Sequence, residues 1–246
     1  MSNFRTVDKY NDLNDPNLIN DIATAPISEE FERKFISKTY LYMVLALVIT
    51  AAVGYFTAST GLILSLFRSS LIFFGLIIAE FVVVFWLSSQ ILKLSTGMAL
   101  FGFLLYSIIN GLTLSAIFLV YTQASIVTAF LITAGMFLVM SLVGFTTKTN
   151  LMGFGGYLMT ALFGIIIASI VNIFLKSSTL YWIISAGGVL IFTILIAYST
   201  QKLKIIAKIA SFEQGSARFA ILAALELYLN FINLLLYVLR FLGKRR

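Results

Sequence analysis

The stretch FAILAALELYLNFINLLLYVLRFL, residues 219–242, is apolar and long enough to cross a lipid bilayer as an α-helix. It nevertheless carries Glu226, Asn230 and Asn233. On a helix these three side chains fall within about 60° of one another, so they form one narrow polar stripe. A charge in mid-membrane costs roughly 2.5 to 3.5 kcal/mol on insertion scales, so we expect the stripe to face protein or water.

The whole chain has the composition of a polytopic membrane protein. Hydrophobic residues make up 60% and charged residues 11% of its 246 residues, and the mean hydropathy is +1.02. A soluble fold of this length cannot bury so much apolar material. Cysteine and histidine are both absent, which removes disulfides, thiolate metal sites and the usual pH switch. Any proton sensing must therefore use carboxylates.

Apolar segments of about 20 residues recur along the chain, each bounded by small or basic residues. Most connections between them are too short for a folded domain, so we expect one all-α bundle of seven transmembrane helices over 39–243. The basic, polar segment 201–218 is the exception among the connections. The predicted spans are 39–59, 70–89, 97–120, 126–147, 153–175, 180–200 and 219–242.

The two ends of the chain differ from this apolar middle. Residues 1–38 hold seven acids, five bases and both prolines, which predicts a polar, mobile amino-terminal arm on the cytoplasmic side. Residues 244–246 form a short basic tail.

Lysine and arginine counts favour an amino terminus inside, because that orientation puts 11 of the 17 bases on the inner side. The bases near the carboxyl terminus oppose it, since an odd number of spans places them outside. A last segment that dips into the membrane and returns would put them inside, so the side of the carboxyl terminus stays open.

Five segments follow one another along the chain: NGLTLSAIF (110–118), VGFTTKTNLMGFGGYL (143–158), IVNIFLKSS (170–178), AYSTQKL (197–203) and LELYLNFINLLLYVLRFLG (225–243). Taken together and in this order, they resemble the Bax inhibitor-1 family, the transmembrane Bax-inhibitor-motif proteins, over roughly residues 38–243. The resemblance implies six helices around a central seventh, and a role as a pH-sensitive calcium leak channel or a regulator of calcium and cell death.

The family's pore is thought to be closed by two aspartates, one on the sixth helix and one on the seventh. This sequence has Ser199 and Asn230 at those positions. Two close carboxylates share a proton and titrate as a pair, whereas serine and asparagine do not change charge. The family's latch therefore cannot be transferred to this chain.

Two acids remain inside the predicted spans, Glu226 and Glu80. Glu226 lies one helical turn before Asn230 on the same face. Our hypothesis is that Glu226, with Glu80 as a possible second group, attracts cations and titrates. Glu226 and Asn230 could also hold calcium transiently through oxygen atoms, with Ser199 and Asn233 as further oxygen donors.

Two simpler interpretations compete with this one. Buried carboxylates and amides in helix bundles often serve packing alone, each hydrogen-bonded to a neighbour. Glu226 could also lie near the membrane surface and face Arg218 or the lysines of 201–218.

The sequence thus leaves two functions open. The first is a pH-modulated calcium or cation leak channel. The second is a non-conducting regulator that binds another integral membrane protein, such as a protease or a stress or cell-death partner. No nucleotide, dinucleotide or hydrolase motif is present, so we expect neither an enzyme nor a cofactor, and the basic flanks do not predict nucleic-acid binding. We expect a bacterial inner membrane, or an endomembrane if the source is eukaryotic.

Overall fold

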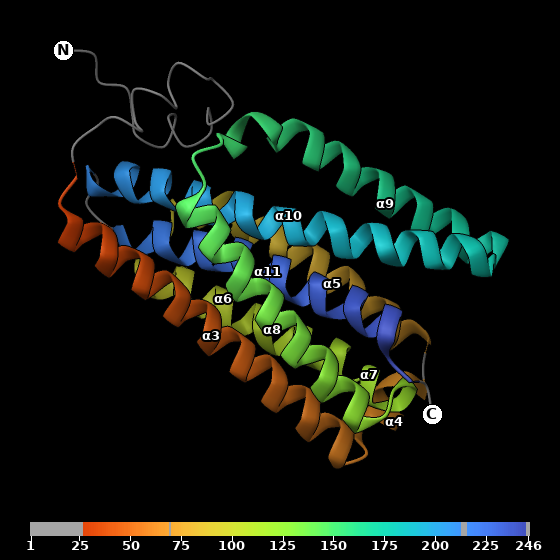
Figure 1. Cartoon of the computed structure of the whole chain (residues 1–246). Helices are drawn as coiled ribbons and strands as arrows, with labels where there is room; N and C mark the ends of the chain where they lie inside the picture. Colours follow the sequence, from red (N-terminus) through yellow and green to blue (C-terminus); the bar gives the residue numbers. More distant parts are fainter. Residues whose placement is uncertain (1–26, 69, 213–215, 245–246) are drawn as a thin grey trace.

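The computed structural model of the chain describes residues 27–68, 70–212 and 216–244, and most of the predicted amino-terminal arm and of the basic tail lies outside them. The described chain is almost entirely helical, which confirms the all-α class (Figure 1). The helices are α3 (Glu29–Ser59), α4 (Leu62–Arg68), α5 (Ser70–Gln90), α6 (Thr96–Leu114), α7 (Ile117–Val120), α8 (Gln123–Thr146), the 3-10 helix η1 (Leu151–Phe154), α9 (Gly155–Leu175), α10 (Ser178–Ser211) and α11 (Ser216–Leu242).

Six helical stretches of the described chain are long and apolar enough to cross a membrane: α3, α6 with α7, α8, η1 with α9, α10 and α11. The apolar stretch Phe74–Gln90 of α5 is shorter than these six. These helices make the chain a multi-pass integral membrane protein. The described chain therefore confirms six of the seven predicted spans, and the span predicted at 70–89 stays a prediction.

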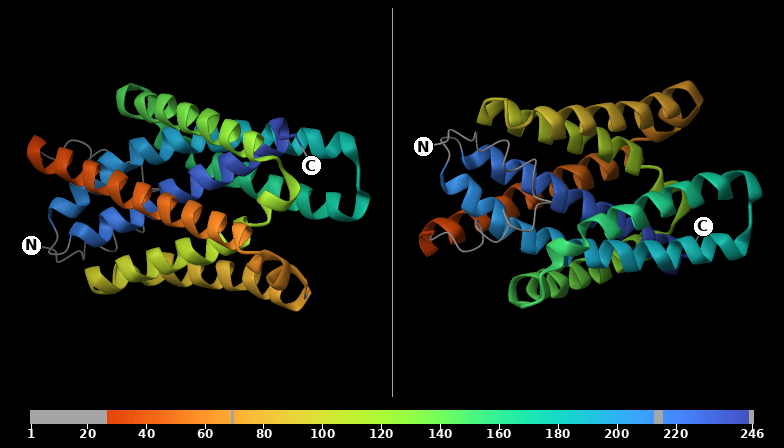
Figure 2. Two further views of the ribbon diagram at one scale, coloured as in Figure 1. Left: turned by 90° about the horizontal axis from the view of Figure 1, so that it is seen from below. Right: turned by 90° about the horizontal axis from the view of Figure 1, so that it is seen from above.

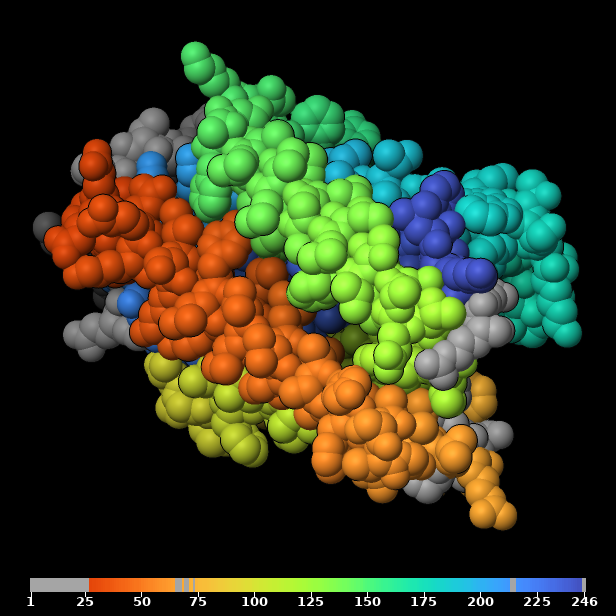
Figure 3. Space-filling model, turned by 60° about the horizontal axis from the view of Figure 1, so that its bottom comes forward, coloured from red at the N-terminus to blue at the C-terminus, as the bar shows by residue number. Residues whose placement is uncertain are grey.

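Helix α11 is the most enclosed of these six stretches. In its apolar part 78% of the residues are buried, against 6% to 39% in the others. It packs against α10, α3, α8 and α6, and on the face in Figure 3 it is visible mainly at its carboxyl end. Outside its polar stripe this helix is apolar, which favours such a position. The polar stripe of α11 therefore faces protein, as expected.

Helix α10 continues well beyond the predicted end of its span at residue 200. Its last three turns carry apolar residues at the spacing of one helix face, namely Leu203, Ile206, Ala207 and Ala210, all of them buried. The lysines of the same segment stand at positions outside this apolar face. The segment 201–218, which sequence reasoning treated as a polar connection, is thus helical through Ser211 and packs into the bundle.

Helix α3 likewise begins earlier than the predicted span. It starts at Glu29, within the predicted polar arm, and runs without interruption through the first apolar segment. Three glutamates in its first turn face the positive end of the helix dipole, which favours this start.

Two glycines allow neighbouring elements to approach closely. A Cβ at Gly144 of α8 would collide with the backbone of Ala197 on α10. A Cβ at Gly188 of α10 would collide with the ring of Tyr237 on α11. These contacts hold α10 tightly between α8 and α11.

The bundle has two distinct ends. Helix α3 begins at one end and α11 finishes at the other (Figure 1). Helix α9 lies on the outside, where it packs mainly against α10 and η1, and only 6% of its apolar stretch is buried. The two views of Figure 2 show the α9–α10 turn at the end where α11 finishes.

Candidate functional site

The first polar cluster joins α10 to α11 through Ser199. The Ser199 hydroxyl donates to Oε1 of Glu226 at 2.8 Å, and it accepts a hydrogen bond from Nδ2 of Asn230 at 2.9 Å. Ser199 and Asn230 are both buried. The two positions that resemble the family's aspartates are therefore neighbours, and both are linked to Glu226.

Lys202 occupies the other oxygen of the same carboxylate. Its Nζ lies 3.0 Å from Oε2 of Glu226. Ser199 and Lys202 are three residues apart on α10, so they share one face of that helix. The structure thus shows Glu226 both paired with a lysine of 201–218 and hydrogen-bonded to Ser199, so contacts of both simpler interpretations are present.

This ion pair borders a cavity of about 330 Å³. Its wall combines apolar side chains of α9, α10 and α11 with Ser88 of α5, Gly155 at the start of α9 and Tyr198. The Lys202 and Glu226 side chains keep 18% and 28% of their surface exposed, so both remain accessible from this space. A cavity of this size with several polar groups can hold water. Any water in this space would therefore be able to contact the pair.

Glu80 belongs to a different polar cluster. Its Oε1 accepts from Nδ2 of Asn110 at 3.0 Å, and the Oδ1 of Asn110 accepts from the Tyr228 hydroxyl at 3.1 Å. The Thr50 hydroxyl lies 2.7 Å from that of Tyr228 and also donates to the carbonyl of Ser107. This second cluster connects α5, α6, α11 and α3. The structure does not bring Glu80 and Glu226 together.

Asn233 also stays apart from the first cluster. Its Nδ2 donates to the carbonyl of Leu229, on its own helix. The stripe predicted on α11 is therefore divided: Glu226 and Asn230 meet α10, whereas Asn233 bonds locally.

Sequence reasoning missed Lys202 as a specific partner, and it missed the links from Tyr228 to Asn110 and Thr50. The spacing of Ser199 and Lys202 was a usable signal, because it puts both on one helix face once α10 is known to continue past residue 200. Nothing in the sequence signalled the Tyr228 contacts.

No group of three or more acidic side chains in the described chain is arranged to hold a metal ion. In the first cluster, Glu226 is the only carboxylate, and Lys202 neutralises it. A tightly held calcium ion needs six to eight oxygen ligands, so this arrangement suits at most transient cation contacts once the lysine has moved.

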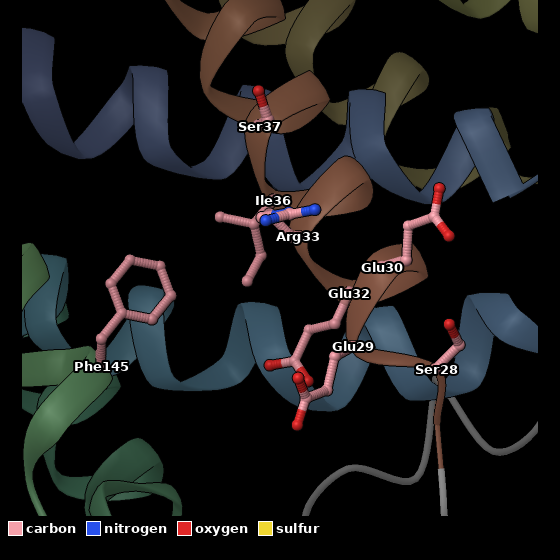
Figure 4. Close-up of a pocket in the computed structure, with 8 residues that line it drawn as sticks. All are labelled: Ser28, Glu29, Glu30, Glu32, Arg33, Ile36, Ser37 and Phe145. Atoms are coloured by element: carbon pink, nitrogen blue, oxygen red, sulfur yellow. The ribbon is translucent and has the colours of Figure 1, made fainter.

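A separate open hollow of about 870 Å³ lies at the start of α3. Figure 4 shows Glu29 and Glu32 near the gap that separates α3 from Phe145, while Glu30 points away from Phe145. Lys34 forms an ion pair with Glu30. These acids are explained by the helix dipole and by local pairing.

The fold and the first cluster define a class, that of all-α membrane proteins in which a largely buried helix carries a carboxylate to a partly open cavity between helices. The family described as "Inhibitor of apoptosis-promoting Bax1" matches residues 32–246. The chain belongs to this Bax inhibitor-1 family, as its motifs predict.

Individual relatives agree with this assignment. The chain is 46% identical over 215 residues to the inner membrane protein YbhL of Escherichia coli. The aligned residues cover 86% of this chain and 92% of that protein. It is 46% identical over 217 residues to an uncharacterized protein of Borreliella burgdorferi, covering 87% and 94% of the two chains. It is 35% identical over 229 residues to an uncharacterized membrane protein of Streptococcus pyogenes, covering 92% and 99%.

Proposed function

We propose that the protein is a pH-modulated leak channel for calcium or other cations in a bacterial inner membrane, and that it is not an enzyme. The observation that carries this proposal is the ion pair of Lys202 and Glu226 at a cavity inside the bundle. Ionisable residues inside a membrane are costly, and those that face a cavity mark ion or proton paths. The inner-membrane location rests on the name of the Escherichia coli relative.

The proposed topology has seven spans with α11 at the centre, and α5 completes the count. Successive long helices run in alternating directions between the two ends of the bundle, which supports this arrangement (Figure 1). Helix α11 is continuous from Ser216 to Leu242, so it contains no turn at which it could dip and return. With the amino terminus inside, the end of α11 lies outside.

In this proposal, the ion pair is the closed latch. While Glu226 is ionised, Lys202 and Ser199 hold α10 against α11 through both carboxylate oxygens. Protonation of Glu226 removes the charge attraction, and Lys202 can then swing away on its flexible stem. An acid–base pair thus replaces the family's aspartate pair, and lowering the pH opens the path.

Cations would meet oxygen atoms on this path. The Ser199 hydroxyl and the Asn230 amide lie beside Glu226, and these are oxygen donors of the kind that calcium accepts. Because only one carboxylate is present, residence would be short, which is what conduction requires.

Reconstitution into liposomes that contain a calcium-sensitive dye tests this proposal. The flux should exceed that of protein-free vesicles and should increase as the pH falls from about 8 to about 5. A flux equal to that of protein-free vesicles at every pH would refute the channel.

A second candidate is a non-conducting regulator that binds another integral membrane protein, such as a protease or a stress or cell-death partner. The exposed position of α9 favours it, because an almost uncovered helix offers a surface to another membrane protein as readily as to lipid. In that case, the polar clusters only hold helices together. The liposome assay separates the two functions, since a regulator gives no flux at any pH.

A further inference from the structure

A basic hollow lies at the end of the bundle opposite the start of α3, between the α9–α10 turn and the end of α11. It has a volume of about 760 Å³, and Lys176 and Arg240 line it, with no acidic residue among the described residues of its wall. Asn172, Ser177 and Ser178 add polar groups. Figure 2 shows the two segments side by side at this end. The hollow is therefore a cationic site that nothing in the wall neutralises.

Arg240 is held in a defined orientation. Its guanidinium lies 3.9 Å from the ring centroid of Tyr181, and the Tyr181 hydroxyl is 3.4 Å from the Arg240 carbonyl oxygen. Nε of Arg240 is buried and has no hydrogen-bond partner among the described residues. A guanidinium stacked on a ring presents its N–H groups at its edge, the geometry that binds phosphate oxygens in pairs.

Lys176 is placed by the turn that ends α9. Its φ is 49°, a left-handed conformation usually taken by glycine or asparagine, and its backbone N–H donates to the carbonyl of Asn172. The side-chain oxygen of Asn172 accepts from the N–H of Ser177, which closes the turn. A defined backbone turn thus places Lys176 at the edge of the hollow, which its flexible side chain lines.

Aromatic side chains set the depth of this site in the membrane. Trp182 and Phe241 meet edge to face with their ring centroids 5.2 Å apart, and Trp182 is 51% exposed. Tryptophan and tyrosine gather at the level of lipid headgroups. We therefore expect Lys176 and Arg240 to lie near the level of the lipid phosphates.

We propose that this basic hollow binds a phosphate anion, carried by the headgroup of an anionic phospholipid or supplied as free phosphate. Lys176 provides a point charge, Arg240 a planar pair of donors, and Ser177 and Ser178 hydroxyl groups that can donate to further oxygens. Basic pockets between transmembrane helices bind anionic headgroups in this way. In the proposed topology this end of the bundle lies outside, where the positive-inside rule disfavours basic side chains. Bound phosphate also explains why Lys176 and Arg240 stand there.

Native mass spectrometry of the purified full chain in a neutral detergent tests the site. The probes are phosphatidylglycerol, phosphatidylcholine as the neutral reference, and orthophosphate as a soluble competitor. The test variant is Lys176→Asn with Arg240→Gln, because asparagine tolerates the left-handed conformation. The control is Lys93→Gln with Lys148→Gln, which removes the same charge from two exposed lysines outside the hollow.

Phosphatidylglycerol should bind more tightly than phosphatidylcholine, and the test variant should weaken its binding about tenfold, while the control should leave it nearly unchanged. Displacement by orthophosphate would identify free phosphate as the ligand, and resistance would identify the lipid. Equal binding of both lipids without an orthophosphate effect, or an equal loss in the control, would overturn the site. If the double variant does not fold, Lys176→Asn alone should give a smaller loss in the same direction, and no loss there would also overturn it.

Discussion

Lys202 of α10 and Glu226 of α11 face each other at 3.0 Å inside the membrane bundle, and Ser199 holds the second oxygen of the same carboxylate. The contact between α10 and α11 at this point is therefore a charge pair, although neither position of the family's aspartate pair carries an acid here.

Substitution of Glu226 by glutamine tests this charge pair. Glutamine can keep the hydrogen bond to Ser199 but cannot attract Lys202. We expect Glu226→Gln to leak more calcium than the wild type at about pH 8, because the charge pair is gone, and its flux to depend less on pH than that of the wild type. Liposome dye measurements across this range check it. A variant whose flux still follows pH like the wild type would show that another group titrates.

Lys202→Met should have the same effect on closure, because it removes the other half of the pair. In a double-mutant cycle, the combination of Lys202→Met and Glu226→Gln should raise flux at about pH 8 no further than either change alone. Lys204→Met is the matched control, since Lys204 donates to the carbonyl of Phe145 and not to Glu226. Additive effects of the two main changes would mean that these residues act independently.

The second cluster should matter for stability rather than for pH response. Tyr228 is fully buried, and its hydroxyl donates to Asn110. Tyr228→Phe leaves this amide oxygen without its partner, at a cost of about 1 to 3 kcal/mol. Thermal unfolding in detergent should show a lower midpoint, while the pH dependence of flux should keep its wild-type shape. A changed pH profile would assign a gating role to this cluster.

Close packing of α10 against α11 predicts a contrast between two glycines. Gly188→Ala brings a methyl group into the ring of Tyr237, so it should destabilise the protein by about 1 to 3 kcal/mol. Gly164→Ala meets no atom within 4 Å, so it should be neutral or slightly stabilising. Thermal midpoints of the two variants check this. Equal midpoints would contradict the tight contact at Gly188.

Helical periodicity and motifs were sufficient to predict the all-α class, the orientation of Glu226 and Asn230 of α11 toward protein, and Ser199 and Asn230 as positions to inspect. They were insufficient for Lys202, because its charge suggested that the span ended at residue 200, whereas the buried apolar face of 203–210 extends the helix. The partners of Glu80 could not be predicted, because the periodicity of one helix does not show which neighbouring helices pack against each of its faces.

A charge swap tests the latch most directly. Lys202→Glu and Glu226→Lys each place two like charges together, so each single variant should leak calcium at about pH 8. The double variant restores an ion pair across the same contact, and we predict that it closes the path again and recovers the acid-induced flux. If the double variant leaks at about pH 8 as much as the single variants do, the ion pair of Lys202 and Glu226 is not what holds the channel closed.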